Sequence, residues 1–210
     1  MPDTIHPNYA LNLPNEILAI ILNELASDED NESLASCRLA SHVLCSIATP
    51  LFFSSIELTD YTDRETGNDS LLMKRATRLN EILTIQNIAA SVYTLTLCCY
   101  HYHQTLEEST SASLMSTILH RLPHIRIFTL ESRQYPFSSF PEEFASAIRA
   151  LCRSPNLTTL YLHYIRGFPF TAITGCPNLR CFRLWDISSL EVNLIFSVLF
   201  CNNSLYIPVQ

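Results

Sequence analysis

The first apolar residues with helical spacing lie in the segment LNLPNEILAIILNEL. Ile17, Leu18, Ile21, Leu22 and Leu25 recur at the spacing that one face of a helix presents. Pro14 suits a first helical turn, where its missing N–H is no loss, and Glu16 suits the positive end of the helix dipole. We therefore predict a helix that ends at the acidic stretch 27–32.

A second helix is predicted at about residues 33–44, with an apolar face turned inward. That face comprises Leu34, Cys37, Leu39 and Val43. Pro50 is expected to interrupt the helical pattern, because proline lacks the backbone N–H that a helix interior needs. The following residues, LFFSSIEL, are expected to form a strand. The polar stretch 59–69 is the predicted boundary between two parts of the chain.

Short strand-like hexads of the form apolar-x-x-(Leu/Phe)-x-Leu recur after this boundary. They occur at Val92/Leu95/Leu97, Ile125/Phe128/Leu130, Leu157/Leu160/Leu162 and Leu179/Phe182/Leu184. Three copies follow a proline by two residues, at Pro123, Pro155 and Pro177. Ile56 and Leu58 are candidates for an earlier, degenerate copy. Units this small cannot bury their own leucines, so the pattern predicts repeats that stack on one another.

Helical stretches alternate with these hexads at 71–90, 113–122 and 141–153, and a short helix or turn is expected at about 168–173. The alternation predicts an α/β fold of strand–helix repeats with a parallel sheet. The apolar stretch 190–201 is predicted to be a core helix, and Pro208 disrupts a fifth hexad. The sequence shows no polar cap for the array, which leaves open whether the array is complete.

Strand alternation places the leucines of each hexad inward and their neighbours outward. The two predicted outward ladders are Thr96, Thr129, Tyr161, Arg183 and Cys98, Glu131, His163, Trp185. Tyrosine, tryptophan and arginine are enriched where proteins bind one another. The predicted target-binding residues are therefore Thr129, Glu131, Tyr161, His163, Arg183 and Trp185. The alternative for Trp185 is packing beneath the C-terminal segment.

Composition narrows the classes of function. Hydrophobic residues make up 48% and charged residues 16%, which argues for a folded chain. A formal net charge of −7 without a basic run argues against a nucleic-acid partner. The three glycines lack the spacing of a phosphate-binding loop. No apolar run reaches the roughly 18–20 residues that span a bilayer, so no membrane association is expected.

The eight cysteines include no C-x-x-C pair, and the first residues lack the pattern of a secretory signal. We therefore expect an intracellular protein, cytoplasmic or nuclear, whose thiols act as small core side chains. Cys98, Cys99, His101 and His103 form the one candidate metal cluster, but no complementary ligand pair stands nearby in the sequence. We expect no metal, no cofactor and, in the absence of a nucleophile motif, no enzyme activity.

Residues 12–55 resemble an F-box, whose pattern opens Leu-Pro-x-Glu-(Leu/Ile)-Leu, as at 13–18 here. The hexads with their leading prolines resemble the leucine-rich repeats of F-box proteins, particularly the divergent fungal kind. The resemblance implies a three-helix F-box at 12–55, a connector at 56–90, and a short repeat solenoid at 91–187. An incomplete or capping segment would follow at 188–210.

This resemblance implies a binding role, in which the apolar face of the F-box packs on the Skp adaptor of a cullin ubiquitin ligase. By position, the adaptor-binding residues are Leu13, Pro14, Ile17, Leu18, Ile21, Leu25, Leu34, Leu39 and Leu44. Leu44 stands where the family often has a tryptophan, and His42 where it often has an arginine. The implied function is a substrate-recognition subunit that holds a protein target. The alternative is a repeat scaffold whose degenerate F-box serves no ligase.

Overall fold

The architecture is given by a computed structural model, which describes residues 13–28, 30–59, 71–99, 109–132, 136–185, 195–201 and 204–206. The chain divides into two compact units, Met1–Phe52 and Phe53–Gln210. The first is helical, and the second is a mixed α/β unit built on a parallel sheet.

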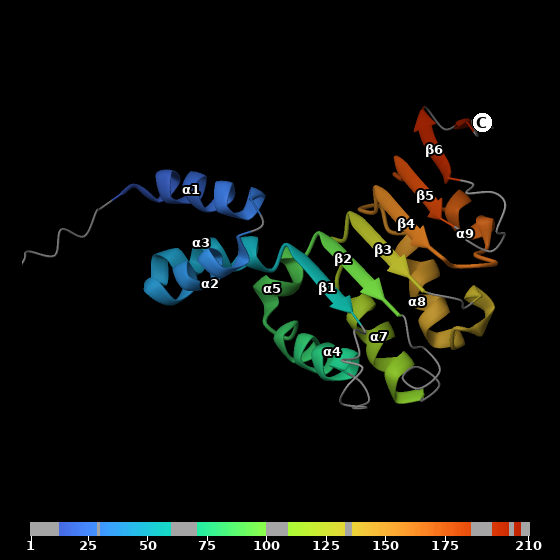
Figure 1. The fold of residues 1–210 in the computed structure, drawn as a ribbon, viewed down its shortest axis with the longest axis horizontal. Coiled ribbons are helices and arrows are strands. Elements are labelled where there is room, and N and C mark those ends of the chain that lie inside the picture. Colours follow the sequence, from blue (N-terminus) through green and yellow to red (C-terminus); the bar gives the residue numbers. More distant parts are fainter. Residues whose placement is uncertain are drawn as a thin grey trace, which may run out of the picture. The chain divides into compact units, whose positions relative to one another are not determined.

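The first unit contains helices α1 (Asn15–Ser27), α2 (Asn31–Ala40) and α3 (His42–Phe52), coloured blue to cyan in Figure 1. Its small core consists of Leu22, Leu34 and Ala48. Two polar contacts support the helices. The Asp30 carboxylate accepts a hydrogen bond from the backbone N–H of Ser33 at 3.0 Å and so caps α2. The Arg38 guanidinium lies 4.8 Å from the centre of the Phe52 ring, which joins α2 to α3.

The second predicted helix is in fact two helices, with Ser41 between them. Ser41 has an extended backbone (φ −161°, ψ 161°), and its hydroxyl accepts a hydrogen bond from the N–H of Leu44 at 3.2 Å. It is therefore the N-cap of α3, a role for which serine is a strong signal in the sequence. The predicted inward positions Leu39 and Val43 are wrong, because these side chains are 89% and 44% exposed. Leu39 lies about 140° around the helix from the buried Leu34.

Pro50 does not end the helical pattern, since it lies inside α3, and the following strand begins at Ser55 and not at Leu51. The proline removes one helical hydrogen bond, which ordinarily disfavours a helix interior. Ile47, Leu51 and Phe52 pack against the core of the unit on either side of it. This packing offsets the lost bond, because helical stability in proteins comes mostly from tertiary contacts.

The second unit contains one open sheet whose strands follow their order in the chain (Figure 1). The strands are β1 (Ser55–Thr59), β2 (Thr94–Cys98), β3 (Ile127–Glu131), β4 (Thr159–His163), β5 (Cys181–Trp185), β6 (Ile195–Cys201) and β7 (Ser204–Tyr206). The first five pair in parallel, and the last two pair antiparallel. The fold is thus α/β with a five-stranded parallel portion.

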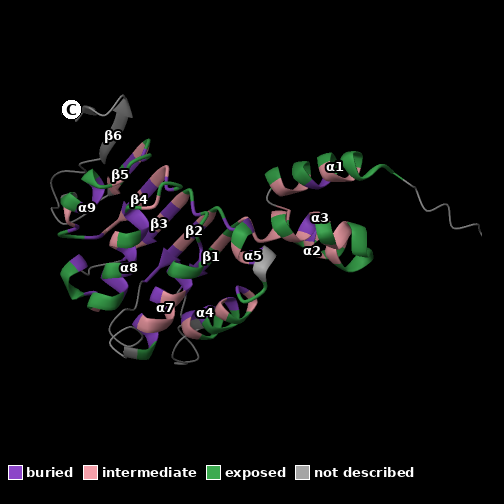
Figure 2. Ribbon diagram, turned by 180° about the vertical axis from the view of Figure 1, so that it is seen from behind, coloured by how far each residue is buried: buried purple, intermediate pink, exposed green. Residues whose placement is uncertain are grey.

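Helices connect the parallel strands and cover one face of the sheet (Figures 1 and 2). They are α4 (Leu71–Ile82), α5 (Gln86–Ser91), α7 (Ser109–Arg121), α8 (Glu142–Cys152) and α9 (Phe170–Thr174), with a 3₁₀ turn η1 at Phe137–Ser139. The predicted helices at 113–122, 141–153 and about 168–173 are confirmed within a few residues. The single helix predicted at 71–90 is wrong, because turns at Leu83–Ile85 divide it into α4 and α5.

The hexads align across the sheet in the register that the sequence predicts. Leu95 lies opposite Phe128, which lies opposite Leu160, and Phe182 follows on β5. All four side chains are at most 2% exposed and belong to one continuous core. The candidate early copy is confirmed as a strand, because Leu58 is buried and pairs in register with Leu97. One face of the parallel sheet therefore forms the core of the unit, against the helices.

The shared prolines have a structural counterpart in a repeated hydrogen bond. The Asn156 side-chain amide donates to the carbonyl of Pro123 at 2.8 Å. One unit further on, the Asn178 amide donates to the carbonyl of Pro155 at 2.7 Å. Each asparagine directly follows the proline of its own unit, so each bond joins one strand–helix unit to the preceding one.

The prediction of a core helix at 190–201 is wrong for its described part, since residues 195–201 form β6. This strand pairs antiparallel with β5, with Phe196 opposite Leu184 and Val198 opposite Phe182. The segment is rich in valine, isoleucine and phenylalanine, which favour strands. An apolar run this short fits a helix or a strand equally well, and the free edge of β5 decides between them.

Candidate binding surfaces

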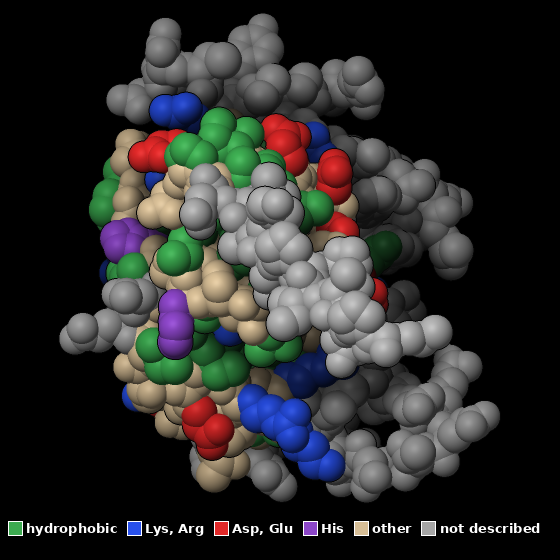
Figure 3. Space-filling view, turned by 90° about the vertical axis from the view of Figure 1, so that its left-hand side faces the viewer, with side chains coloured by type: hydrophobic (Ala, Val, Ile, Leu, Met, Phe, Trp, Pro, Cys, Tyr) green, Lys and Arg blue, Asp and Glu red, His purple; other side chains and the backbone are tan. Residues whose placement is uncertain are grey.

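The first surface is the outer side of α1. Leu13, Ile17, Ile20 and Ile21 are 36%, 43%, 58% and 46% exposed. Leu22 on the same helix is 2% exposed and belongs to the core. The apolar stripe of α1 is wider than the neighbouring helices can cover, so part of it faces outward. In the space-filling view of Figure 3, hydrophobic side chains lie at the surface beside acidic ones.

The predicted adaptor-binding residues fall into three groups. Leu13, Pro14, Ile17, Ile21 and Leu39 are exposed, and Leu18, Leu25 and Leu44 are half-buried. Leu34 is 1% exposed and fills the internal core, so in this fold it supports the helices and offers no surface. Leu25 and Leu44 also pack against that core. The exposed Ile20 and Val43 were missed, although Ile20 lies only about 60° around α1 from Ile17.

The second surface is the sheet face opposite the helices, where the register produces both predicted ladders. Thr96, Thr129, Tyr161 and Arg183 are consecutive partners on β2 to β5. Cys98, Glu131, His163 and Trp185 form the neighbouring ladder on the same strands. The structure thus brings all six predicted target-binding residues to three adjacent strands. The Trp185 side chain lies outside the described residues.

Aromatic and cationic groups meet at β4 and β5. The Arg183 guanidinium stacks on the Tyr161 ring at 5.5 Å from its centre, and the His163 ring lies 6.4 Å from that of Tyr161. Burial raises the pKa of the Tyr161 hydroxyl, as does the neighbouring Cys181 thiol, whereas Arg183 acts in the opposite direction. Tyr164, directly after β4, has a φ of 59°, a conformation that bulky residues rarely adopt and that recurs at functional sites.

The ends of the ladders differ from their centre. Thr59 and Cys98, on β1 and β2, are 6% and 4% exposed, although their positions point away from the helices. The Cys98 thiol donates to a Glu131 carboxylate oxygen at 3.8 Å. Elsewhere on this face, Glu57 on β1 and Arg183 on β5 are exposed, and the described outward side chains of β3 and β4 are half-buried.

One feature beside the starts of the strands was missed in the sequence. The Arg126 guanidinium stacks on the Tyr93 ring at 4.9 Å from its centre, where β2 and β3 begin. Both side chains are exposed. Arg126 occupies the second position of its hexad, as Arg180 does, so the available signal was a basic residue recurring at one hexad position.

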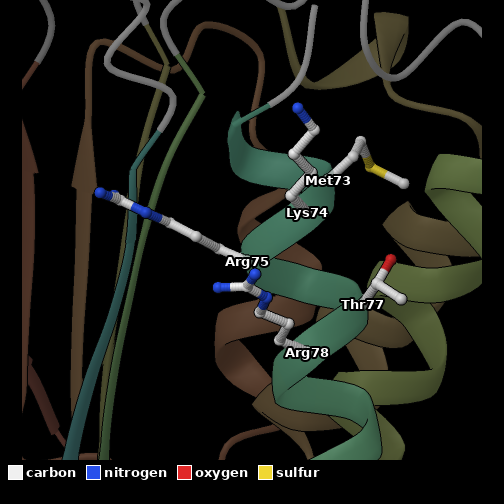
Figure 4. A pocket seen from close by; sticks show the side chains of 5 residues that line it. All are labelled: Met73, Lys74, Arg75, Thr77 and Arg78. Atoms are coloured by element: carbon white, nitrogen blue, oxygen red, sulfur yellow. The ribbon is translucent and has the colours of Figure 1, made fainter.

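A hollow of about 510 Å³ lies beside α4 and is lined by Met73, Lys74, Arg75, Thr77 and Arg78 (Figure 4). The Arg75 side chain extends towards β1, where it donates to the Thr59 hydroxyl at 3.0 Å. Lys74 points away from Arg75 and is exposed. All five described lining residues come from one helix, α4.

The described cysteines bear on the expectation of core thiols. Cys98, Cys99 and Cys152 are buried, as predicted. The hydrogen bond between the thiols of Cys152 and Cys176 raises the pKa of Cys152, as does its burial, and lowers that of Cys176. His101 and His103 lie outside the described residues. Within the described ranges, no group of three or more His, Cys, Asp or Glu side chains could hold a metal ion.

Two further observations concern the chain as a whole. No helix in the described part of the chain is long and apolar enough to cross a membrane. Comparison of the chain with protein-family models, with curated proteins and with solved structures found no match.

Proposed function

We propose that this protein is a substrate-recognition subunit of a Skp–cullin–F-box ubiquitin ligase. In this proposal, the first unit is an F-box that binds the Skp adaptor. The second unit is a short leucine-rich-repeat solenoid that holds a protein target on the open face of its sheet. The protein itself performs no chemistry, and it acts by raising the effective concentration of the target near the transfer machinery.

The observation that carries the proposal is the exposed apolar face of α1. Among its described residues, the first unit has three buried apolar core side chains, yet α1 alone leaves Ile17, Ile20 and Ile21 more than 40% exposed. A contiguous apolar patch on a small unit is typical of a surface that a partner covers. The opening residues 13–18, which give the F-box resemblance, lie on this same helix and at its start.

Three features support the repeat assignment of the second unit. The hexads align in one register, the strands pair in chain order, and the asparagine–proline bonds recur between successive units. Stacked repeats that contact their neighbours predict all three. Such an array presents one continuous surface, here the ladders on β3 to β5, to a protein target.

Adaptor binding tests the proposal directly. We expect the double substitution Ile17→Asp and Ile21→Asp to abolish co-purification with a Skp adaptor, because a charge at either position would be buried unpaired in the interface. Both side chains are exposed in the isolated unit, so the helices should remain folded, as circular dichroism would show. The matched control, Asn15→Asp with Asn23→Asp, adds the same charge to exposed polar positions of α1 and should bind normally.

Undiminished adaptor binding by the folded Ile17/Ile21 variant would contradict the F-box assignment. The second candidate, a repeat scaffold without a ligase role, has one observation in its favour. Leu44, at the position where the family often has tryptophan, packs against the internal core and presents no large anchor. Failure of the wild-type chain to bind any Skp adaptor, with target binding intact, would favour this scaffold.

A further inference from the structure

Two thiols from successive strand–helix units meet at the ends of α8 and α9. Cys152 is the last residue of α8, and Cys176 follows α9 directly after Gly175. The two thiols are hydrogen-bonded to each other. The residues beside them also touch, because a Cβ atom built on Gly175 would lie 3.8 Å from Cγ of Arg153. The ends of the two helices are thus in contact at two successive residue pairs.

The two cysteines differ in their access to solvent. Cys152 is fully buried in the continuous core, whereas Cys176 is half-buried and packs against that core. The Cys176 thiol donates a hydrogen bond to the carbonyl of Ala172 at 3.4 Å, and its backbone N–H donates to the carbonyl of Ile173 at 3.0 Å. A small reagent in solution can therefore reach the Cys176 sulfur, whereas the Cys152 sulfur is shielded.

The hydrogen bond between the thiols gives the two sulfur atoms different roles. A Cys152 thiol that donates to Cys176 stabilises the Cys176 thiolate and lowers its pKa, while burial acts in the opposite direction. The pKa of Cys152 is raised by the same bond, by burial and by the charge of Cys176. The thiolate is the nucleophilic form of cysteine, so Cys176 is suited to react first. Once the Cys176 sulfur is oxidised and neutral, the charge that disfavours a Cys152 thiolate is gone.

We propose that Cys152 and Cys176 form a redox-active dithiol, which a peroxide converts into a reversible disulfide between two successive strand–helix units. The two sulfur atoms must approach from hydrogen-bond contact to about 2 Å. Cys176 lies outside α9, so the short connection after that helix can supply this movement. The ring closed by the bond would include β4 and α9, and would brace the strand that carries Tyr161 and His163.

The oxidation balances with one molecule of hydrogen peroxide. The Cys176 thiolate attacks one peroxide oxygen, which forms an S–O bond and breaks the O–O bond. The products are a sulfenic acid and a hydroxide that takes up a proton to become water. The Cys152 sulfur then attacks the sulfenic sulfur, and its proton leaves with the departing hydroxide as a second water. The two thiols lose two electrons, and the peroxide gains them.

Peptide mapping of the full chain by mass spectrometry tests the inference. Trypsin, which cleaves after arginine, places Cys152, Cys176 and Cys181 in the separate peptides 150–153, 167–180 and 181–183. After treatment of the dilute folded chain with a small excess of hydrogen peroxide, we expect peptides 150–153 and 167–180 to be joined by a disulfide. Dithiothreitol should separate them. Cys176 should react about tenfold faster than Cys181, which is also half-buried but lies on β5.

Three variants separate the roles of the thiols. Cys176→Ser should abolish the linked peptides and leave Cys152 reduced. Cys152→Ala should leave the Cys176 sulfenic acid without a partner, so that dimedone traps it and further peroxide converts it to a sulfinic acid. The matched control, Cys181→Ser, removes another half-buried thiol and should give the linked peptides as the wild type does. Circular dichroism would show that each variant is folded.

Several results would overturn the inference. Oxidation of Cys176 in the wild type to a sulfinic acid, without linked peptides, would show that Cys152 does not reach it. The same yield of linked peptides from the urea-unfolded chain would show that the fold does not select this pair. Equal reaction rates at Cys176 and Cys181 would show that the contact with Cys152 does not activate Cys176.

Thermal unfolding tests the bracing role of the disulfide. The midpoint temperature of the cross-linked chain should rise by several degrees, because the bond restricts the unfolded chain, and should return to its former value after reduction. An unchanged or lower midpoint would show that the bond does not brace the fold. Because neither thiol lies in the first unit, the result is independent of whether the chain binds a Skp adaptor.

Discussion

At the scale of single residues, burial separates side chains that look equivalent in the sequence. Leu34 and Leu39 both lie on α2 and both fit the F-box resemblance, yet Leu34 is 1% exposed and Leu39 is 89% exposed. The first stabilises the unit, and the second is available to a partner. The same division within α1 leaves Ile17 and Ile21 outward while Leu22 is buried. The proposed adaptor-binding surface thus reduces to the outward members of the predicted set.

A residue-scale prediction concerns Lys74, the only lysine in the chain. Ubiquitin is attached to an amine, and the permanently protonated guanidinium of arginine cannot replace it. Because Lys74 is exposed on α4, self-modification in a reconstituted ligase should occur there or on the N-terminal amine. With that amine blocked, Lys74→Arg should abolish the ubiquitin ladder. Adding Arg78→Lys to this variant returns an amine one turn away and should restore it, whereas ladders on Lys74→Arg alone would refute the prediction.

At the scale of elements, local signals set the helices and strands, and neighbours set where they end. The Ser41 cap divides α2 from α3, and the packing of α3 overrides Pro50. In the second unit, the Asn156 and Asn178 amides connect successive strand–helix units through the proline carbonyls. The bonds lie at the constant offset that the prolines keep from the hexads, but a backbone carbonyl of any residue could accept them, so they do not explain the choice of proline.

An element-scale prediction follows from these bonds. Asn156→Ala and Asn178→Ala should each lower the free energy of unfolding by about 1 kcal/mol, the usual net value of one intramolecular hydrogen bond. Denaturant titration would measure the change. His124 occupies the equivalent position after Pro123, and the structure records no such bond from it, so His124→Ala should be neutral within about 0.5 kcal/mol. Equal effects at all three positions would show that the amide bonds do not stabilise the stack.

At the scale of the whole molecule, each unit has its own core. The core of the second unit is continuous from Leu58 on β1 to Phe182 on β5, and so joins all the strand–helix units. Phe128, fully buried on β3, lies near its middle. A continuous core predicts that damage at one strand is felt by its neighbours, because the units share buried contacts and do not stand alone.

We therefore expect Phe128→Ala to lower the free energy of unfolding by about 3–5 kcal/mol. Hydrogen exchange should show the same loss of protection in β2, β3 and β4. The neighbouring Thr129 points to the open face, so Thr129→Ala should change stability by less than about 0.5 kcal/mol. Loss of protection confined to β3 would mean that the units unfold separately.

The sequence by itself determined the α/β class, the strands of the repeats and their register. Register could be predicted because a side-chain period of two, repeated in each hexad, allows only one alignment that buries Leu95, Phe128 and Leu160 together. The same alternation assigned Thr129, Tyr161 and Arg183 to one outward ladder. These features depend on the spacing of residues that are close together in the chain, and this spacing is visible in the sequence.

Tertiary structure alone decided features that depend on residues distant in the chain. The free edge of β5 made residues 195–201 a strand, and the neighbouring helices decided which apolar residues of α1 are buried. The stacking of Arg126 on Tyr93 joins residues 33 positions apart, which periodicity cannot reveal. A local pattern indicates which structures a segment can form. Which of them it does form depends on the free energy of burial and strand pairing, and that free energy depends on residues elsewhere in the chain.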